Sequence, residues 1–266
     1  MNESRKVHEK QFFDETFETE GRKPVQKFYR TIQSSRKYYE NYLFTHSKNK
    51  DVIEYGCGKG TYAFLLAKHG ARVVGIDISE VAIEIAKTRA KEQAVENVEF
   101  LEQDAEAMEF DDNSIDLIFG TSILHHLHLN KAMNEISRVL KPEGKAVFIE
   151  PLGHNPLINL YRKLTPRYRT EDEHPLTMKD LKFIKDFFNQ TYFRFFHLFS
   201  LLAVPFRNTK IFSSLLKIFD GLDAKLFKWL PFLKPMAWQV VIILEKPNQN
   251  ESEPKRKLAY RIKTDT

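Results

Sequence analysis

The chain of 266 residues contains a single cysteine, Cys57. One thiol cannot form an internal disulfide, so the composition suits a reducing compartment. The N-terminal segment is charged and has no apolar core, which is not typical of a signal peptide. Within the most apolar segment, residues 200–235, charged side chains interrupt every run before it approaches the roughly 20 residues that span a bilayer. These absences lead us to expect a cytoplasmic protein.

Glycine is also scarce, with 10 residues in the whole chain, and three of them stand in one short turn. An apolar run ends at Glu54, and the glycines follow at alternate positions, as Gly56, Gly58 and Gly60. A strand, a glycine turn and a helix in this order are typical of a loop whose backbone approaches a ligand closely. A dinucleotide-binding turn needs its third glycine at position 61, which is Thr61 here. The turn therefore disfavours a dehydrogenase.

Acidic residues also end the next two predicted strands. Asp77 follows an apolar run about 20 positions beyond the glycines, where a carboxylate can accept hydrogen bonds from ribose hydroxyls. Asp104 follows the third strand, and its carboxylate can accept from an adenine amino group. Because ligands of open α/β sheets bind at the carboxyl ends of the strands, we expect these groups to line one site.

Strands and helices alternate over residues 50–150. The predicted strands cover residues 52–54, 71–76, 98–101, 115–119 and 145–150. The fourth strand runs into Thr121 and the pair His125-His126, so polar groups again follow a strand end. This alternation predicts an α/β fold with a parallel sheet.

The whole series of motifs resembles that of class I S-adenosylmethionine (SAM) methyltransferases, within the type 11 group of small-molecule methyltransferases. Glu54-x-Gly56-x-Gly58-x-Gly60 resembles the first motif, and residues 138–144 resemble the last. The resemblance implies SAM as cofactor, with S-adenosylhomocysteine as product. It also implies a Rossmann-like, seven-stranded, mostly parallel sheet with helices on both faces. The cofactor-binding residues that it implies are Glu54, Gly56, Cys57, Gly58, Gly60, Asp77, Ile78, Asp104, Ala105 and Thr121.

The chain is expected to have three parts. Residues 1–47 fit two helices, which in this family commonly lie across the SAM pocket as a lid. Tyr29 is a candidate lid contact, and the alternative is that its ring packs a helix onto the sheet. Residues 48–247 are expected to form the methyltransferase domain, and the polar residues 248–266 are expected to be disordered.

Residues 200–235 form a predicted hydrophobic helical insertion between two further strands, at 191–199 and 237–245. Helices are expected before it at 157–164 and 178–188. Lysines stand beside Phe, Leu and Trp in the insertion, a composition that suits a helix lying in a membrane interface. The alternative is that the insertion packs its apolar face on the domain and roofs a hydrophobic substrate pocket.

Two histidines, His125 and His126, stand next to where the methyl group of SAM should point. A neutral imidazole there can deprotonate a hydroxyl acceptor, and the alternative is that one ring caps the next helix while the other packs. We expect no metal, because adjacent side chains on one helix do not face one site and no convergent carboxylates accompany the pair. Candidates for contact with the substrate are Tyr29, His154, Tyr161, Arg169 and His174.

Lys and Arg exceed Asp and Glu by 41 to 36, which we attribute to a solvated surface rather than to nucleic-acid binding. No Asn-Pro-Pro-Tyr follows the fourth strand and no Pro-Cys pair occurs, which disfavours methylation of nucleic-acid bases. We therefore predict a SAM-dependent methyltransferase that modifies oxygen, carbon or nitrogen of a small-molecule or lipid-like acceptor. Whether residues 200–235 contact a membrane peripherally or roof the substrate pocket stays open at the level of sequence. The alternative is a noncatalytic SAM-fold protein that binds a membrane or a partner through the same segment.

Overall fold

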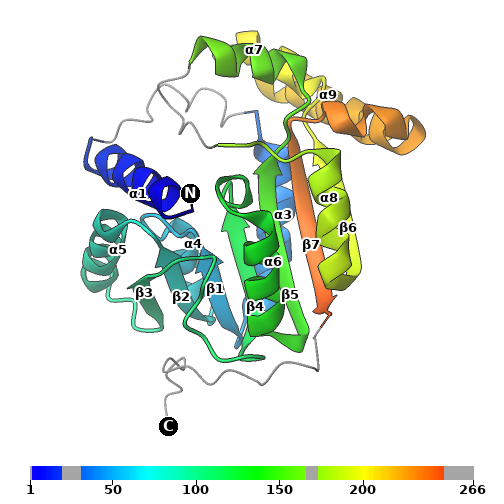
Figure 1. The fold of residues 1–266 in the computed structure, drawn as a ribbon. Helices are drawn as coiled ribbons and strands as arrows, with labels where there is room; N and C mark the ends of the chain where they lie inside the picture. The colour runs from blue at the N-terminus through cyan, green and yellow to red at the C-terminus, as the bar shows by residue number, and fades with distance from the viewer. Residues whose placement is uncertain (1, 20–30, 166–172, 249–266) are drawn as a thin grey trace.

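The structure is a computed structural model, and it describes residues 2–19, 31–165 and 173–248. Tyr29, Arg169 and the tail from residue 249 onward lie outside the described residues. The described chain forms one central sheet with helices on both faces and further helices beyond one edge of the sheet (Figure 1).

The sheet has seven strands in the order β3-β2-β1-β4-β5-β7-β6. Its strands are β1 (Asp51–Tyr55), β2 (Arg72–Asp77), β3 (Val98–Glu102), β4 (Ile115–Thr121), β5 (Leu140–Pro151), β6 (Phe188–Phe196) and β7 (Gln239–Pro247). All pairings from β3 to β5 are parallel, and β7 runs antiparallel to both β5 and β6. The predicted α/β fold with a seven-stranded, mostly parallel sheet is confirmed.

Several predicted boundaries in the second half of the chain are displaced, and the strand predicted at 145–150 extends over Leu140–Pro151 as β5. The helix predicted at 178–188 ends at Ile184, and a 3-10 turn, η4 (Lys185–Phe187), leads directly into β6. Its start is as predicted, because Thr177 and Asp180 form a capping box. β6 thus begins three residues before the predicted 191–199, while β7 begins two residues after the predicted 237–245.

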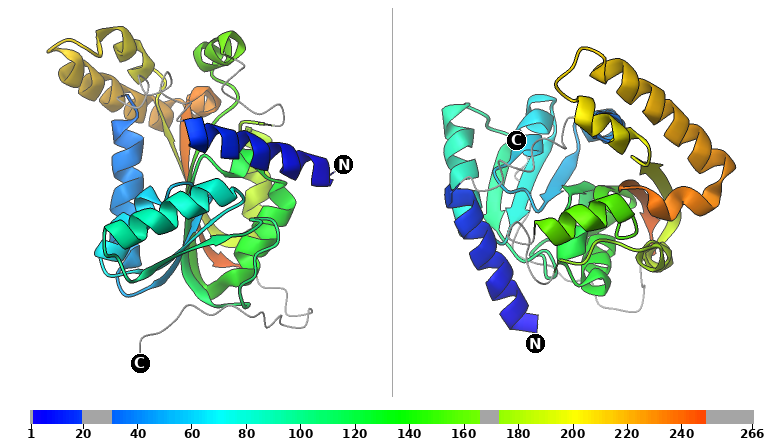
Figure 2. Two further views of the ribbon diagram at one scale, coloured as in Figure 1. Left: turned by 90° about the vertical axis from the view of Figure 1, so that its left-hand side faces the viewer. Right: turned by 90° about the horizontal axis from the view of Figure 1, so that it is seen from above.

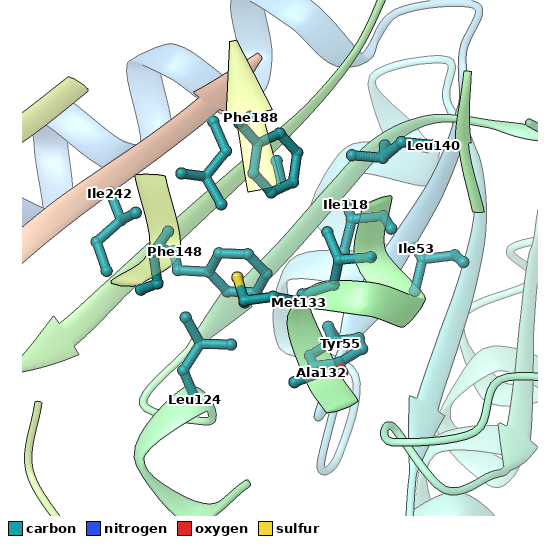
Figure 3. Packing of buried hydrophobic residues seen from close by; sticks show 14 of the residues in the cluster. Ile53, Tyr55, Ile118, Leu124, Ala132, Met133, Leu140, Phe148, Phe188 and Ile242 are labelled. Atoms are coloured by element: carbon teal, nitrogen blue, oxygen red, sulfur yellow. The ribbon is translucent and has the colours of Figure 1, made fainter. Parts of the chain in front are cut away.

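Five of the described helices cover the two faces of the sheet. One face carries α3 (Gln33–Ser47), α4 (Thr61–Lys68) and α5 (Glu80–Glu92), and the other carries α6 (Leu129–Val139) and α8 (Met178–Ile184). On the α6 face, Met133 packs near Phe148 and Ile118 of the sheet, and none of the three side chains is exposed to solvent (Figure 3). Burial of such apolar surface, at roughly 25 cal/mol per Å², holds the helices on the sheet.

Three helices lie at or beyond the carboxyl edge of the parallel strands. α1 (Asn2–Thr19) crosses this edge near β3 and α5, and α7 (Pro156–Leu164) and α9 (Phe212–Trp229) extend beyond it (Figures 1 and 2). The glycine turn after β1 stands at the same edge. These three helices therefore lie at the same end of the sheet as the predicted site.

The insertion at 200–235 consists of η5 (Ser200–Phe206), α9 and η6 (Pro231–Met236). One face of α9 is buried through Phe212, Leu216 and Phe227. Asp223 on the same face is 3% exposed, and its carboxylate accepts the backbone N–H groups of residues 198, 199 and 200 at 2.8–3.1 Å. The insertion is thus fixed to the end of β6. Among the helices that the structure describes, none has the length and apolar content to cross a membrane.

Candidate active site

The glycine turn after β1 has a backbone that side chains would strain. Gly56 and Gly60 have φ values of +70° and +72°, in the left-handed region. A Cβ atom on Gly56 would lie 2.7 Å from the side chain of Ile123, and one on Gly60 would lie 2.5 Å from the ring of Phe100. Glycine at these positions lets the turn lie close against its neighbours.

Glu54 is the next-to-last residue of β1, and its side chain reaches the start of α4. It is 5% exposed, and its carboxyl accepts the backbone N–H of Ala63 at 2.8 Å. Burial raises the pKa of Glu54 to about 8, although the N–H groups of Ala63 and Tyr62 act in the opposite direction. A buried carboxyl of this kind suits a site for a cation, because a positive group next to it would offset the free-energy cost of ionising the carboxyl away from water.

Asp77 ends β2 and is held by the backbone of two turns. Its carboxylate accepts from the N–H of Gly58 at 2.8 Å and from the N–H of Ser79 at 3.0 Å. Burial raises the pKa of Asp77, and these N–H groups act against the rise. The glycine turn and the start of α5 therefore fix one carboxylate between them.

Asp104 follows β3, and α1 covers it. Its carboxylate accepts the N–H of Glu106 at 2.8 Å, and Lys6 of α1 forms an ion pair with it. Arg5 of α1 pairs with Glu106, whose side chain is almost fully buried, and donates to the backbone oxygen of His126. α1 is thus fastened across the ends of β3 and β4. Sequence reasoning missed the pair of Arg5 and Glu106, because the two residues are 101 positions apart along the chain.

These groups surround a cavity of about 740 Å³. The predicted residues that line it are Glu54, Gly56, Cys57, Gly58, Asp77, Ile78, Asp104, Ala105, Thr121 and His126. Gly60 shapes the turn but is not among the described lining residues. Burial raises the pKa of the Cys57 thiol well above its usual value, which does not suit a nucleophile.

The N-terminal helices supply much of the remaining wall. Their contributions are Arg5, Lys6, Glu9, Phe13, Thr16 and Phe17 from α1, and Ile32, Arg36 and Tyr39 from α3 and the residue before it. None of the described lining residues comes from 200–235, so the expectation that the insertion roofs the pocket is wrong for this cavity. The covering element is α1.

His125 and His126 stand in a 3-10 turn, η2 (Leu124–His126), rather than in a helix. His126 lines the cavity and contacts the ring of Phe13 edge to face, with centroids 5.3 Å apart. The two imidazole centroids are 4.2 Å apart, and one ligand atom from each ring lies within 4.8 Å of a carboxylate oxygen of Glu173. The expectation that the adjacent rings cannot face one site is therefore wrong, because the tight turn keeps them side by side. The side-chain cap is also absent, since α6 starts after His128 without one.

The three substrate candidates that the structure describes do not reach the cavity. His154 is exposed, Tyr161 lies partly buried on α7, and His174 donates its backbone N–H to the oxygen of His125 at 3.1 Å. None of these three is among the described lining residues. His174 therefore contributes to the site through its backbone, by holding the segment that carries Glu173 against η2.

A buried network that sequence reasoning missed closes the α3 side of the cavity. Ser35 donates to the side-chain oxygen of Gln239 at 2.7 Å, and its hydroxyl lies 2.7 Å from Nε2 of His197. Nδ1 of His197 lies 3.0 Å from the hydroxyl of Ser200. Burial lowers the pKa of His197 to about 3, so the ring is neutral at physiological pH.

Residues 46–189 match the family model described as "Methyltransferase domain", which is more than half of the chain. The chain therefore belongs to this methyltransferase family, and the resemblance to class I SAM methyltransferases is confirmed. SAM is the cofactor of the family.

Curated relatives match over the cofactor half. The chain is similar to a demethylmenaquinone methyltransferase of Lactococcus lactis, with 34% identity over 121 residues that make up 44% of this chain and 47% of the relative. It is also 34% identical to a ubiquinone biosynthesis O-methyltransferase of Coxiella burnetii over 122 residues, 46% of this chain and 51% of the relative. The chain thus spans about half the length of the curated relatives that it matches.

Solved structures share the fold over more of the chain. A phosphoethanolamine N-methyltransferase of Haemonchus contortus, bound to S-adenosylhomocysteine, superposes with a TM-score of 0.64 at 16% identity and covers 90% of this chain and 60% of its own. A geranyl diphosphate C-methyltransferase of Streptomyces coelicolor gives a TM-score of 0.58 at 13% identity and covers 80% of this chain and 78% of its own. At these identities the likeness establishes the fold.

Proposed function

We propose that the chain binds SAM in the cavity at the carboxyl edge of the sheet and transfers its methyl group to a small, lipid-like acceptor. The observation that carries this proposal is that Glu54, Asp77 and Asp104 line one cavity. Their order along the sheet matches three groups of SAM: Glu54 would face the ammonium, Asp77 the ribose hydroxyls and Asp104 the adenine amino group. The glycine turn between them allows close approach of the backbone.

The methyl group would then point toward Thr121 and His126, beyond the end of β4. Transfer from a sulfonium is an in-line displacement, and most of its acceleration can come from alignment of the nucleophile with the methyl group and sulfur. An imidazole at this end suits an acceptor that must lose a proton, such as a hydroxyl. Nδ1 of His125 lies 2.7 Å from the carboxylate of Glu150, which fixes the orientation of this ring beside His126.

The acceptor class is supported by the wall of the cavity and by the relatives. Phe13, Ile123 and Leu127 provide apolar surface near His126. The two relatives above are named as a demethylmenaquinone methyltransferase and a ubiquinone biosynthesis O-methyltransferase, and quinones are molecules with an oxygenated ring. We therefore propose an acceptor with a ring hydroxyl or ring carbon and an apolar body.

The direct test is calorimetric titration of the full chain with SAM and, separately, with NAD. We expect SAM to bind with a dissociation constant in the micromolar range and NAD to show no heat of binding. Transfer of a labelled methyl group into cell extract, separated into lipid, small-molecule and macromolecular fractions, should label the lipid fraction. Absence of SAM binding would exclude the proposed function, and labelling confined to macromolecules would exclude the acceptor class.

The second part of the proposal is that α9 contacts the membrane surface. Ile211, Ile218, Leu222 and Trp229 are 40–69% exposed and follow one another at seven, four and seven positions, close to whole turns of a helix. They therefore form one exposed apolar stripe on α9. This stripe is separate from the buried face of the helix described above. Lys225 is exposed close to this stripe, an arrangement that suits an anionic lipid surface.

Point substitutions test this contact better than removal of 200–235, which would uncover the buried face of α9. Changing Ile218 and Leu222 together to Asp should reduce co-sedimentation with vesicles that contain phosphatidylglycerol by at least about tenfold, because each charge opposes burial in the lipid interface. The matched control changes Ser213 and Ser214 to Asp, which adds the same charge to exposed polar positions. If both double variants sediment like the unaltered chain, α9 is not the contact.

A further inference from the structure

Two imidazoles and three carboxylates meet at the end of the cavity, on η2 and the segments packed against it. His125 and His126 stand side by side, and Glu9 of α1, Glu150 of β5 and Glu173 each approach one of the two rings within 3.8 Å. All five side chains are between 0% and 11% exposed. Imidazoles and carboxylates gathered in this way are candidate ligands of a transition-metal ion.

The orientation of His125 is set by a buried carboxylate. One oxygen of Glu150 accepts the backbone N–H groups of Ile123 and Leu124, both at 2.9 Å, and the other lies 2.7 Å from Nδ1 of His125. Since a carboxylate only accepts, Nδ1 carries the proton and Nε2 presents its lone pair. A histidine that ligates a metal commonly donates its other N–H to a carboxylate in this way.

The lone pair of His125 faces another electron donor. Nε2 lies 3.8 Å from a carboxylate oxygen of Glu173, too far for a hydrogen bond, and a nitrogen of His126 belongs to the same group of atoms, all within 4.8 Å of one another. Ligand atoms bound to one zinc ion at about 2.0–2.2 Å stand roughly 3.0–3.5 Å apart, so a separation of 4.8 Å would have to shorten by roughly 1.3–1.8 Å to bring the three together.

We propose that His125, His126 and Glu173 bind one divalent transition-metal ion, with Glu150 holding His125 in the ligating orientation. Two imidazole nitrogens and one carboxylate favour zinc, iron, cobalt or nickel over magnesium, which prefers oxygen ligands. Three protein ligands leave a coordination position open, as catalytic metal sites require. His126 also lines the cavity, so the open position would be reached from the acceptor end.

The role that we give to this ion rests on the proposed methyl transfer, although its binding does not. A hydroxyl or phenol oxygen of the acceptor would occupy the open position. The ion would lower the pKa of that oxygen, and the proton would leave to solvent before the oxygen displaces the methyl group from sulfur. A metal would thereby replace a general base at the acceptor end of the cavity.

The test uses the untagged full chain, freed of metal by a chelator and titrated with Co²⁺ while d–d absorption is recorded. We expect one Co²⁺ per chain with visible bands, displaced by Zn²⁺. The variants H125A, H126A and E173Q should each lose at least about tenfold in Co²⁺ affinity. E150Q should lose about 10–100-fold through the misplaced imidazole. The matched control H69A removes an exposed histidine remote from the site and should leave Co²⁺ affinity unchanged.

Far-ultraviolet circular dichroism and titration with S-adenosylhomocysteine establish that each variant is folded. No Co²⁺ binding, or binding that H125A, H126A and E173Q leave unchanged, would overturn the metal site. Binding of Co²⁺ by a chain that fails to bind SAM would uphold the site and overturn the proposed function instead. The two conclusions are therefore tested by separate measurements.

Discussion

Glu54 is a cavity-lining residue whose buried carboxyl binds its proton more tightly than an exposed carboxyl would. Its carboxyl is buried at the end of β1, and its pKa of about 8 means that it is mostly protonated at neutral pH. A ligand ammonium next to it would favour the ionised form, because an opposite charge within a few ångströms lowers the pKa of a carboxyl. Cofactor binding and proton release are then coupled at this one residue.

We predict that S-adenosylhomocysteine, which carries the ammonium, releases up to one proton from the chain on binding at pH 7. Calorimetric titration in two buffers of different ionisation enthalpy measures the number of protons. 5′-Methylthioadenosine, which lacks the amino-acid part, should release none, and the variant E54Q should release none with either ligand. Equal heats in both buffers for S-adenosylhomocysteine would show that Glu54 is already ionised in the free chain.

Residues of the cofactor half were predictable because their signals are local. Glu54, Asp77 and Asp104 each lie at or within two residues of the end of a strand that the apolar pattern identifies, and a parallel sheet brings such ends together. Glu150 also ends a predicted strand, but its role depends on His125 of a different strand end. The two residues are 25 positions apart, and no pattern in a single sequence indicates that their side chains are in contact. The same holds for Arg5 and its partner Glu106.

At the scale of elements, α1 is the part that closes the cavity, and ion pairs fasten it. Arg5, Lys6 and Lys10 on α1 pair with Glu106, Asp104 and Glu102 after or at the end of β3. Phe17 lies against the glycine turn, where a Cβ atom on Gly58 would be 3.1 Å from its ring. A ligand in the cavity would have to pass this helix, so the ion pairs should govern how fast it leaves.

We predict that the double variant R5A/K10A releases S-adenosylhomocysteine about tenfold faster than the unaltered chain. The substitutions remove two of the pairs and leave the pair between Lys6 and Asp104 intact. Stopped-flow displacement measures the rate, and added salt should narrow the difference because it screens the exposed pair of Lys10. H8A, an exposed substitution on the same helix, is the control. An unchanged release rate in R5A/K10A would mean that α1 does not limit ligand exit.

Two elements differ from their predictions for physical reasons. The histidine pair was expected on a helix, where neighbouring side chains diverge, but a 3-10 turn of three residues carries it and Leu127 then turns to an extended conformation. For α9 the composition left two alternatives, a packed helix or an interfacial one. The structure shows a packed stripe and an exposed stripe on the same helix. Composition does not separate two apolar stripes when both consist of large apolar side chains.

At the scale of the whole molecule, two buried groups make stability depend on pH with opposite signs. His197 has its pKa lowered to about 3, so the unfolded chain takes up a proton that the folded chain refuses, and stability falls as pH drops from about 6.5 to about 3. Glu54 has its pKa raised to about 8, so the folded chain keeps a proton that the unfolded chain releases, and stability falls as pH rises from about 4.5 to about 8.

Between about pH 4.5 and 6.5 the two dependences oppose each other, at up to about 1.4 kcal/mol per pH unit each. We predict that replacing either residue leaves only the pH dependence that the other residue contributes to the free energy of unfolding, measured with urea on the ligand-free chain. E54Q should gain stability relative to the unaltered chain as pH rises through this window, because only the His197 slope remains. H197Q should be less stable at neutral pH, having lost the contact with Ser35, and should lose relative stability as pH rises.

Other carboxyls titrate in the same pH range in the unaltered chain, in E54Q and in H197Q. The differences in unfolding free energy between these three proteins therefore isolate the contributions of Glu54 and His197. Parallel pH profiles for all three would show that folding changes the proton affinity of neither group.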